Sequence, residues 1–343
     1  MRLDRAPFGT LSDGTPVELY SCANDTGVTV ELTPFGATLV AVWAPDRDGV
    51  PGPITLGFPE LAGYLQRHPY FGSTIGRYAN RIAGAAFHLE GQLYRLAATD
   101  GPNHLHGGEV GLGRRLWEAE PFEDADEAGV RFRYTSPAGE DRYPGTVSVE
   151  AAYSLTSAGE LVVALSATAD AATPLNLTNH AYWNLAGAGD ILGHELAISA
   201  EHYLPVDDGQ IPTGRIAPVA DTPFDFRASK PIGRDLFDIP GDRIGYDHCF
   251  VLRHREALAP AARLHDPGSG RVMDVATTQP GLQLYTGNNL RGFEPHGGFE
   301  RFAGVCLETQ HFPDSPNRPE FPSTILAPGE RYAHTTVHRF STV

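Results

Sequence analysis

The chain has 343 residues, and its 42 acidic against 26 basic side chains give a formal net charge of −16. An acidic surface repels phosphate backbones and anionic lipid, so we expect neither nucleic acid nor a membrane surface as a partner. No apolar run approaches the length of a membrane span. The three cysteines, Cys22, Cys249 and Cys306, fit neither a disulfide framework nor a CxxC zinc motif, which favours a cytoplasmic protein.

In chain order, apolar alternation and turn residues predict many strands and one brief helix, at 59–68. The clearest strands are 147–155 and 161–167, which alternate on either side of a Ser-Ala-Gly turn and predict a hairpin. Further strands are expected at 28–32, 38–43, 87–89, 93–96, 130–134, 195–200, 249–253, 272–277, 281–285, 305–309 and 331–340. The Glu-Gly-Gln turn at 90–92 predicts that 87–89 and 93–96 form a hairpin. Many strands without strand–helix alternation predict an all-β, antiparallel sandwich with few short helices. Since no composition break or linker divides the chain, we expect one domain over residues 1–343.

Residues 175–187, LNLTNHAYWNLAG, combine strand alternation with a polar face. A strand from Leu175 would place its leucines on one face and three polar side chains, ending at His180, on the other. Tyr182 and Trp183 follow directly. This arrangement suits a wall that contacts a polar ligand, although an amphipathic strand with a surface histidine is the alternative.

Two further polar patches precede that stretch. GRYANRIAG at 76–84 carries Asn80 and Arg81 between glycines and predicts a loop of hydrogen-bond donors, with a solvated basic loop as the alternative. NHLHGG at 103–108 carries His104 and His106, which would share one face of a strand at a spacing that metal sites use. Because the sequence offers no carboxylate or third histidine nearby, we do not expect a metal there.

Later in the chain, carboxylates join apolar strands. Asp247 precedes the apolar run at 249–253, where a turn-forming role is the alternative. Gln283 alternates with leucines, and Glu308 shares a strand face with Cys306. Burial of Glu308 would raise its pKa toward useful base strength, whereas an edge strand would expose it to water. Cys306 has no base motif beside it and is interpreted as a packing residue.

Taken together, these patches supply amides, guanidinium groups, carboxylates, imidazoles and aromatic rings. Amides, arginine and carboxylates bind hydroxyl groups, and aromatic faces bind C–H patches, which together describe a sugar site. One carboxylate base with one imidazole acid describes proton transfer without a cofactor. The sequence contains no serine nucleophile elbow, P-loop or dinucleotide fingerprint.

Seven motifs in order resemble the aldose 1-epimerase (galactose mutarotase) family over about residues 11–340. They are GRYANRIAG, NHLHGG, NLTNHAYWNLAG, LPVDDGQIPTG, YDHCFVL, QPGLQLYTGN and CLETQHFPDSPNRPEFPSTILAPGERY. The resemblance implies a large β-supersandwich with an open groove. It also implies interconversion of the α and β anomers of free aldohexoses such as glucose and galactose, without metal or cofactor, by a monomer or homodimer.

The same resemblance assigns roles to single residues. It implies that His180 is the general acid and Glu308 the base. Substrate contacts would fall on Asn80, Arg81, His106, Tyr182, Asp247 and Gln283. Two departures are mild: Trp183 stands where the family often has phenylalanine, and residues 291–302 match no familiar motif, which leaves the preferred sugar open.

Such a mechanism needs an ionised Glu308 and a charged His180 at the start. We expect a nearby carboxylate, with Asp247 as the candidate, to raise the pKa of His180; His106 could instead share the acid role. Three rival functions are a non-catalytic sugar-binding module, a sugar-phosphate epimerase with basic groups in its groove, and a metal-dependent sandwich enzyme using His104, His106 and His248.

Overall fold

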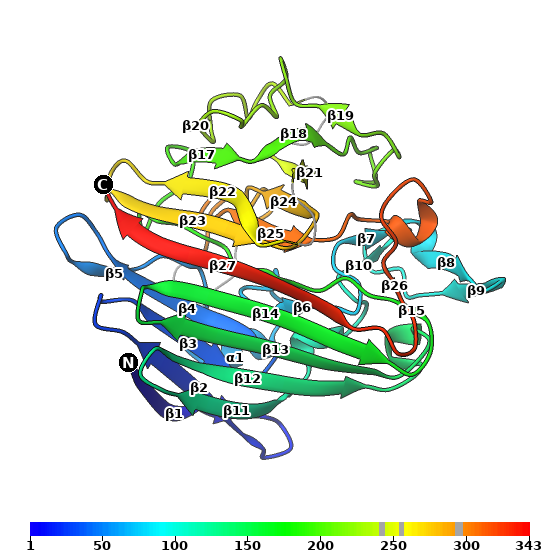
Figure 1. Cartoon of the computed structure of the whole chain (residues 1–343), viewed down its shortest axis with the longest axis horizontal. Helices are drawn as coiled ribbons and strands as arrows, with labels where there is room; N and C mark the ends of the chain where they lie inside the picture. Colours follow the sequence, from blue (N-terminus) through cyan, green and yellow to red (C-terminus); the bar gives the residue numbers. More distant parts are fainter. Residues whose placement is uncertain (240–243, 254–256, 292–297) are drawn as a thin grey trace.

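The computed structural model describes residues 1–239, 244–253, 257–291 and 298–343. Strands dominate it and named strands pair antiparallel throughout, which confirms the expected all-β class. Figure 1 shows a large sheet running through the molecule, with further sheets packed against it. No helix in the described ranges is long and apolar enough to cross a membrane.

The largest sheet contains nine strands. Their order is β11 (Glu118–Glu123), β12 (Glu127–Ser136), β13 (Val147–Thr156), β14 (Glu160–Ala169), β27 (Tyr332–Thr342), β23 (Arg271–Thr277), β22 (Ala259–His265), β17 (Glu195–Ile198) and β20 (Lys230–Pro231). The β13–β14 hairpin confirms the prediction from alternation. The last strand, β27, lies between β14 and β23, so the C-terminal segment joins the two halves of the sheet (Figure 1).

Two five-stranded sheets complete the layers. One runs β1 (Arg2–Thr10), β2 (Pro16–Ala23), β3 (Thr29–Thr33), β4 (Thr38–Pro45) and β5 (Pro51–Pro53). The other runs β19 (Ala217–Pro218), β18 (Ala200–Tyr203), β21 (Asp247–Leu252), β24 (Gly281–Tyr285) and β25 (Cys306–Gln310). The sequence analysis missed β1, whose side chains are mostly exposed and show no apolar alternation.

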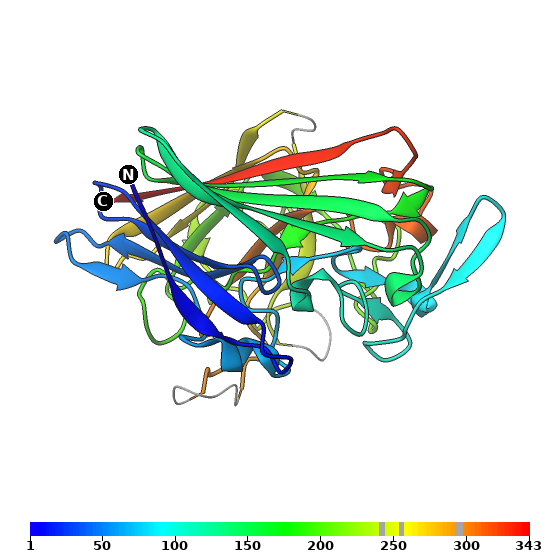
Figure 2. The same cartoon turned by 90° about the horizontal axis from the view of Figure 1, so that it is seen from below.

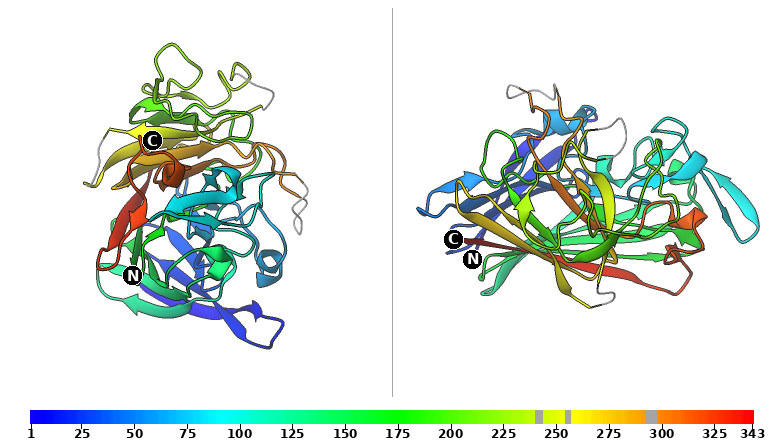
Figure 3. Two further views of the ribbon diagram at one scale, coloured as in Figure 1. Left: turned by 90° about the vertical axis from the view of Figure 1, so that its right-hand side faces the viewer. Right: turned by 90° about the horizontal axis from the view of Figure 1, so that it is seen from above.

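Short elements close one side of the sandwich. The paired strands are β6 (Thr74–Ile75) with β16 (Thr178–Asn179), β7 (Arg81–Ile82) with β10 (His104–Leu105), β8 (Ala86–Leu89) with β9 (Gln92–Arg95), and β15 (Thr173–Pro174) with β26 (Ile325–Leu326). The helices are α1 (Leu61–Leu65), inside the predicted 59–68, and the 3₁₀ turns η1 (Ala83–Ala85), η2 (Leu112–Arg114), η3 (Glu140–Arg142) and η4 (Ser315–Asn317). The β8–β9 hairpin, predicted from its Glu-Gly-Gln turn, projects from one end of the molecule (Figure 3).

One hydrophobic core joins the layers. The largest buried cluster takes Val30 from the first sheet, Phe132 and Tyr153 from the nine-stranded sheet, and Phe250 and Leu282 from the third sheet. Figure 2 shows the first sheet lying against the β11–β14 half of the large sheet. Burying each such side chain stabilises the fold by about 1.5–3 kcal/mol. The sandwich is therefore a rigid support for the short ladders at its side.

The stretch 175–187 is less regular than predicted. Only Thr178–Asn179 forms a strand, so a full strand from Leu175 to His180 was wrong in extent. The alternation of faces nevertheless holds, because Leu175 and Leu177 join the main core. On the other face, the Thr178 hydroxyl donates to the Thr309 carbonyl oxygen at 2.9 Å, which ties this stretch to β25.

Candidate active site

Three neighbouring strands form one wall of the site. In the order β21, β24, β25, Gln283 pairs with Glu308 on one side and with Cys249 on the other. The Gln283 amide donates from Nε2 to Asp247 Oδ1 at 2.6 Å. Strand register therefore brings Asp247, Gln283 and Glu308 together although 61 positions separate the first from the last.

The opposite wall is the short β7–β10 ladder. Leu105 pairs with Arg81, and the chain then turns at His106, whose φ is +50°. His106 N–H donates to the Asn80 carbonyl oxygen at 3.0 Å, and Asn80 N–H donates back to His106 Nδ1 at 3.2 Å. This reciprocal pair of hydrogen bonds fixes the imidazole relative to Arg81.

Arg81 links the two walls electrostatically. Its Nε donates to Asp100 Oδ2 at 2.7 Å, and its Nη1 lies 3.7 Å from Asp247 Oδ2. The guanidinium side chain is only 10% exposed, so these charges interact in a poorly solvated environment. Arg81 is thereby held with its positive charge near Glu308.

His180 and Tyr182 come from the segment after β16. Two backbone hydrogen bonds to residues 72 and 73 hold His180 in place. Tyr182 stacks on its imidazole with ring centroids 5.0 Å apart, and Tyr70 stacks at 5.8 Å. Aromatic packing therefore fixes the plane of the ring and excludes water from it.

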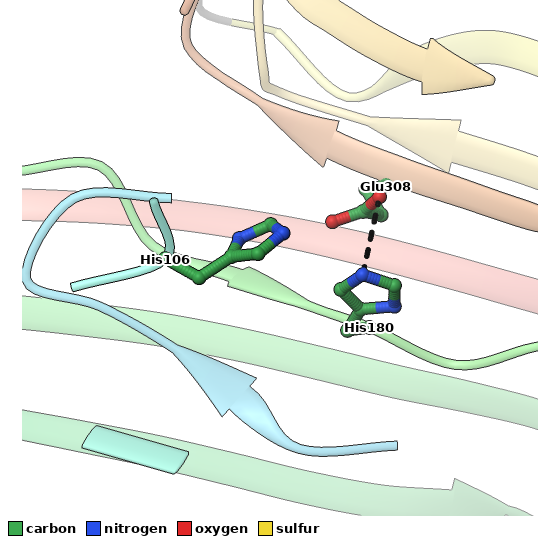
Figure 4. Close-up of side chains that lie close together, drawn as sticks. All are labelled: His106, His180 and Glu308. Carbon is green, nitrogen blue, oxygen red and sulfur yellow. Dashed lines mark ion pairs between the residues drawn. The ribbon is translucent and has the colours of Figure 1, made fainter. Parts of the chain in front are cut away.

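These walls enclose a cavity of about 800 Å³. Every site residue expected from the sequence lines it except Gln283, which lies behind and bonds to Asp247. Figure 4 shows His180 facing Glu308, with Nε2 and Oε1 3.8 Å apart, and His106 beside them. Glu308 is 3% exposed in its side chain, and its Oε2 has no hydrogen-bond partner among the described residues.

Burial dominates the electrostatics of this pair. It raises the pKa of Glu308 well above its usual range, helped by the negative charge of Asp247 and opposed by Arg81. It lowers the pKa of His180 to about 3. The expectation that Asp247 raises the pKa of His180 was therefore wrong, because desolvation prevails and Asp247 acts on Glu308 instead. Burial therefore favours the neutral form of both groups.

His106, His180 and Glu308 also offer the ligand set of many zinc sites, with ligand atoms within 4.8 Å of one another. The hydrogen bond from Asn80 N–H occupies the Nδ1 lone pair of His106. A neutral imidazole then carries its proton on Nε2 and presents no lone pair to the cavity. The group does not fit a metal unless that hydrogen bond breaks.

The other histidines considered for a metal lie apart from this cluster. His104 bonds to the Ala97 carbonyl oxygen and the Tyr143 hydroxyl, so the expectation that it shares a face with His106 was wrong. The positive φ of His106 turns its side chain out of the strand pattern. His248 accepts from Asp247 N–H and contacts Phe224.

Several cavity residues were missed from the sequence. Tyr70, Asp100 and Tyr285 line the cavity, as do Arg67 and Arg114. Tyr70 lies in the run His-Pro-Tyr-Phe-Gly, whose aromatic content is the only local signal of a binding role. Of residues 291–302, the segment without a familiar motif, 292–297 lie outside the described residues.

Comparisons with known proteins agree with one another. The family model described as aldose 1-epimerase matches residues 18–339. A galactose mutarotase from Bos taurus is 46% identical and an aldose 1-epimerase from Escherichia coli (strain K12) is 36% identical, covering 98% and 96% of both chains in each pair. A solved structure of a GalM/aldose epimerase homologue from C. elegans superposes with a TM-score of 0.89 at 32% identity, covering 95% of this chain and 99% of that one.

Proposed function

The chain belongs to the aldose 1-epimerase family and interconverts the α and β anomers of aldoses, and we propose that Glu308 and His180 carry the two proton transfers. The observation that carries this assignment is the pair itself: a buried carboxyl faces an imidazole at 3.8 Å in the cavity, and one of its oxygens has no hydrogen-bond partner within the described part of the chain. The reaction needs one group at the anomeric hydroxyl and one at the ring oxygen.

In the proposed ring opening, the Glu308 carboxylate takes the proton of the anomeric hydroxyl. The C1–O1 bond becomes a carbonyl as the C1–O5 electron pair moves to O5, which takes a proton from His180 Nε2. Rotation about C1–C2 then exposes the other carbonyl face. Closure returns the proton from Glu308 to O1 and the proton on O5 to His180, so the pair ends as it began.

The total number of protons on Glu308 and His180 stays constant through this cycle. Ionised Glu308 with charged His180 holds the same number of protons as neutral Glu308 with neutral His180. Burial favours the neutral arrangement, which is the one that follows ring opening. The sugar must therefore favour the charged arrangement on binding, and a hydroxyl group donating to the unpartnered Glu308 Oε2 supplies that bias.

The remaining site residues bind and orient the sugar in this proposal. Asn80, Arg81 and Asp247 supply hydroxyl contacts, and Tyr182 supplies an aromatic face. Gln283, expected to contact the sugar, instead orients Asp247 through its hydrogen bond to Oδ1. His106 acts as a hydrogen-bond donor through Nε2–H rather than as a second acid, because burial keeps its pKa well below the usual range and Asn80 fixes its tautomer. No metal or cofactor takes part in these steps.

Polarimetry on freshly dissolved α-D-glucose and α-D-galactose, with a chelator present, tests this function. Faster decay to the same final rotation supports it, and the ratio of the rates gives the preferred aldose. D-glucose 6-phosphate should be tested as a third substrate, because Arg67 and Arg114 line the cavity and basic side chains bind phosphate. Acceleration with the phosphate ester alone would favour a sugar-phosphate epimerase, and sugar binding without acceleration would favour a binding module.

We also propose that residues 1–343 form a single aldose 1-epimerase domain. One buried hydrophobic cluster with residues from Tyr20 to Tyr332 supports this proposal. The three cysteines are free and buried, in keeping with a reducing cytoplasmic location. A monomer or homodimer is proposed as the assembly.

A further inference from the structure

Cys306 contacts the proton-transfer pair directly. Its Sγ lies 3.5 Å from His180 Nδ1, within the distance of a sulfur hydrogen bond. The thiol is fully buried, and 126 positions of sequence separate the two residues. The interpretation of Cys306 as packing alone leaves this contact unexplained.

The geometry of β25 places Cys306 and Glu308 at the two edges of the same imidazole. The residues are two positions apart and share a strand face, so one rigid segment carries both. Cys306 meets Nδ1, whereas Glu308 faces Nε2 at 3.8 Å. With Tyr182 and Tyr70 on the ring, His180 is fixed in plane and in rotation.

Thiol chemistry suits this position. A thiol is a weak donor and a weak acceptor, so it keeps contact with Nδ1 whether that atom has a lone pair or a proton. A carboxylate there could only accept, and it would hold a permanent charge on the imidazole and oppose proton release. Burial raises the pKa of the thiol well above its usual range, and the opposing effect of a hydrogen bond with Tyr182 is smaller.

We propose that Cys306 is a positioning residue for proton transfer, holding the Nδ1 edge of His180 so that Nε2 stays aimed at the reacting oxygen and Glu308. It does not touch the sugar, since it does not line the cavity. The inference rests on the proposed roles of His180 and Glu308. It predicts an effect on turnover rather than on sugar binding.

The test compares Cys306→Ala, which removes the contact, with Cys306→Ser, which keeps a donor and acceptor. We expect Cys306→Ala to lower kcat about tenfold, a part of the hundred- to ten-thousand-fold that an acid–base group contributes, with KM changed by less than about twofold. Cys306→Ser should recover most of that loss. Polarimetric progress curves at several sugar concentrations separate kcat from KM.

Cys22→Ala is the matched control. Cys22 is also fully buried, but it lies in β2 within the main core. Both alanine variants should lose similar thermal stability, yet only Cys306→Ala should lose turnover. Equal kcat values for the two alanine variants, or a Cys306→Ser variant no better than Cys306→Ala, would overturn the proposal.

A second readout does not depend on activity. In protein labelled with ¹⁵N-histidine, the Nδ1 signal of His180, assigned by its loss in His180→Asn, should shift in Cys306→Ala and stay unchanged in Cys22→Ala. An unchanged signal in Cys306→Ala contradicts the contact. If wild-type protein accelerates no mutarotation but the signal shifts, the proposed function fails while the contact stands.

Discussion

Replacing Glu308 by glutamine separates its chemistry from its packing. Glutamine has nearly the same shape but cannot take up the proton of the anomeric hydroxyl. Gln283, the neighbouring Asp247 and the cavity walls remain in place, so sugar binding should change little. The expected result is a lower kcat with KM nearly unchanged.

The magnitude follows from the role assigned by the structure. A positioned acid–base group contributes about 10²–10⁴ in rate, equivalent to about 2.7–5.5 kcal/mol of transition-state stabilisation. Residual activity would come from His180 and the oriented binding of the sugar. The loss should be similar for glucose and galactose, because both present the same hemiacetal to the pair.

At alkaline pH the Glu308→Gln variant should be at least as stable as wild type, although its kcat is lower. The folded-state pKa of Glu308 lies above its unfolded value, so its contribution to stability is fully present below about pH 4.5 and is lost as pH rises through the raised pKa. Glutamine does not titrate. The variant should therefore unfold at an equal or higher temperature than wild type at alkaline pH, because wild type there loses about 1.4 kcal/mol of unfolding free energy for each unit by which folding raises the Glu308 pKa.

Polarimetry and thermal unfolding on the same samples check both parts. Glu31→Gln is the control, since Glu31 is a half-buried carboxyl of β3 whose pKa burial also raises and which does not line the cavity. It should keep wild-type kcat. A folded Glu308→Gln variant with kcat within about tenfold of wild type would refute the assignment of the base.

Four other outcomes are expected. Asp247→Asn removes the charge that raises the Glu308 pKa, so the alkaline limb of kcat against pH should move to lower pH; an unmoved limb contradicts this coupling. His106→Ala removes a donor and should lower kcat/KM about tenfold, mainly through KM, as steady-state polarimetry can show. Burial lowers the pKa values of His248 and His338 to about 4, so each stabilises the fold above its unfolded pKa of about 6.5, and this stabilisation is lost as pH falls. The free energy of unfolding from urea titrations should therefore be lower at pH 5 than at pH 7 by about 2 kcal/mol for each of the two histidines. Dialysis against a chelator should leave activity unchanged, and loss restored by a metal would contradict the tautomer argument for His106.

Local pattern was enough to predict the class of fold. The β13–β14 hairpin follows from period-two alternation around a tight turn, and the β8–β9 hairpin follows from its turn residues. The shared motifs identified seven of the residues that line the cavity, because each motif is a short contiguous segment, but they missed Tyr70 and Asp100. Strand β1 could not be found in this way, since its exposed side chains carry no apolar period.

The orientation of the site side chains and the shifts of their pKa values depend on contacts between segments that are distant in the sequence. Alternation suggested that His104 and His106 face the same way, but a positive φ at His106 and its hydrogen bonds with Asn80 separate them. The charge state that the mechanism needs suggested that Asp247 would raise the pKa of His180, but burial of the imidazole lowers it. Desolvation is set by every segment packed around a group, so it cannot be inferred from the neighbours in sequence.

The sequence by itself therefore determined the all-β class, the clearest hairpins, the family and the chemical identity of most site residues. Only the tertiary structure decided the directions of their pKa shifts, the tautomer of His106 and the contact of Cys306 with His180. The physical reason is distance along the chain. Register between β21, β24 and β25 brings Asp247 and Glu308 together across 61 positions. The contact of β25 with residues near β16 joins groups separated by 126 and 131 positions.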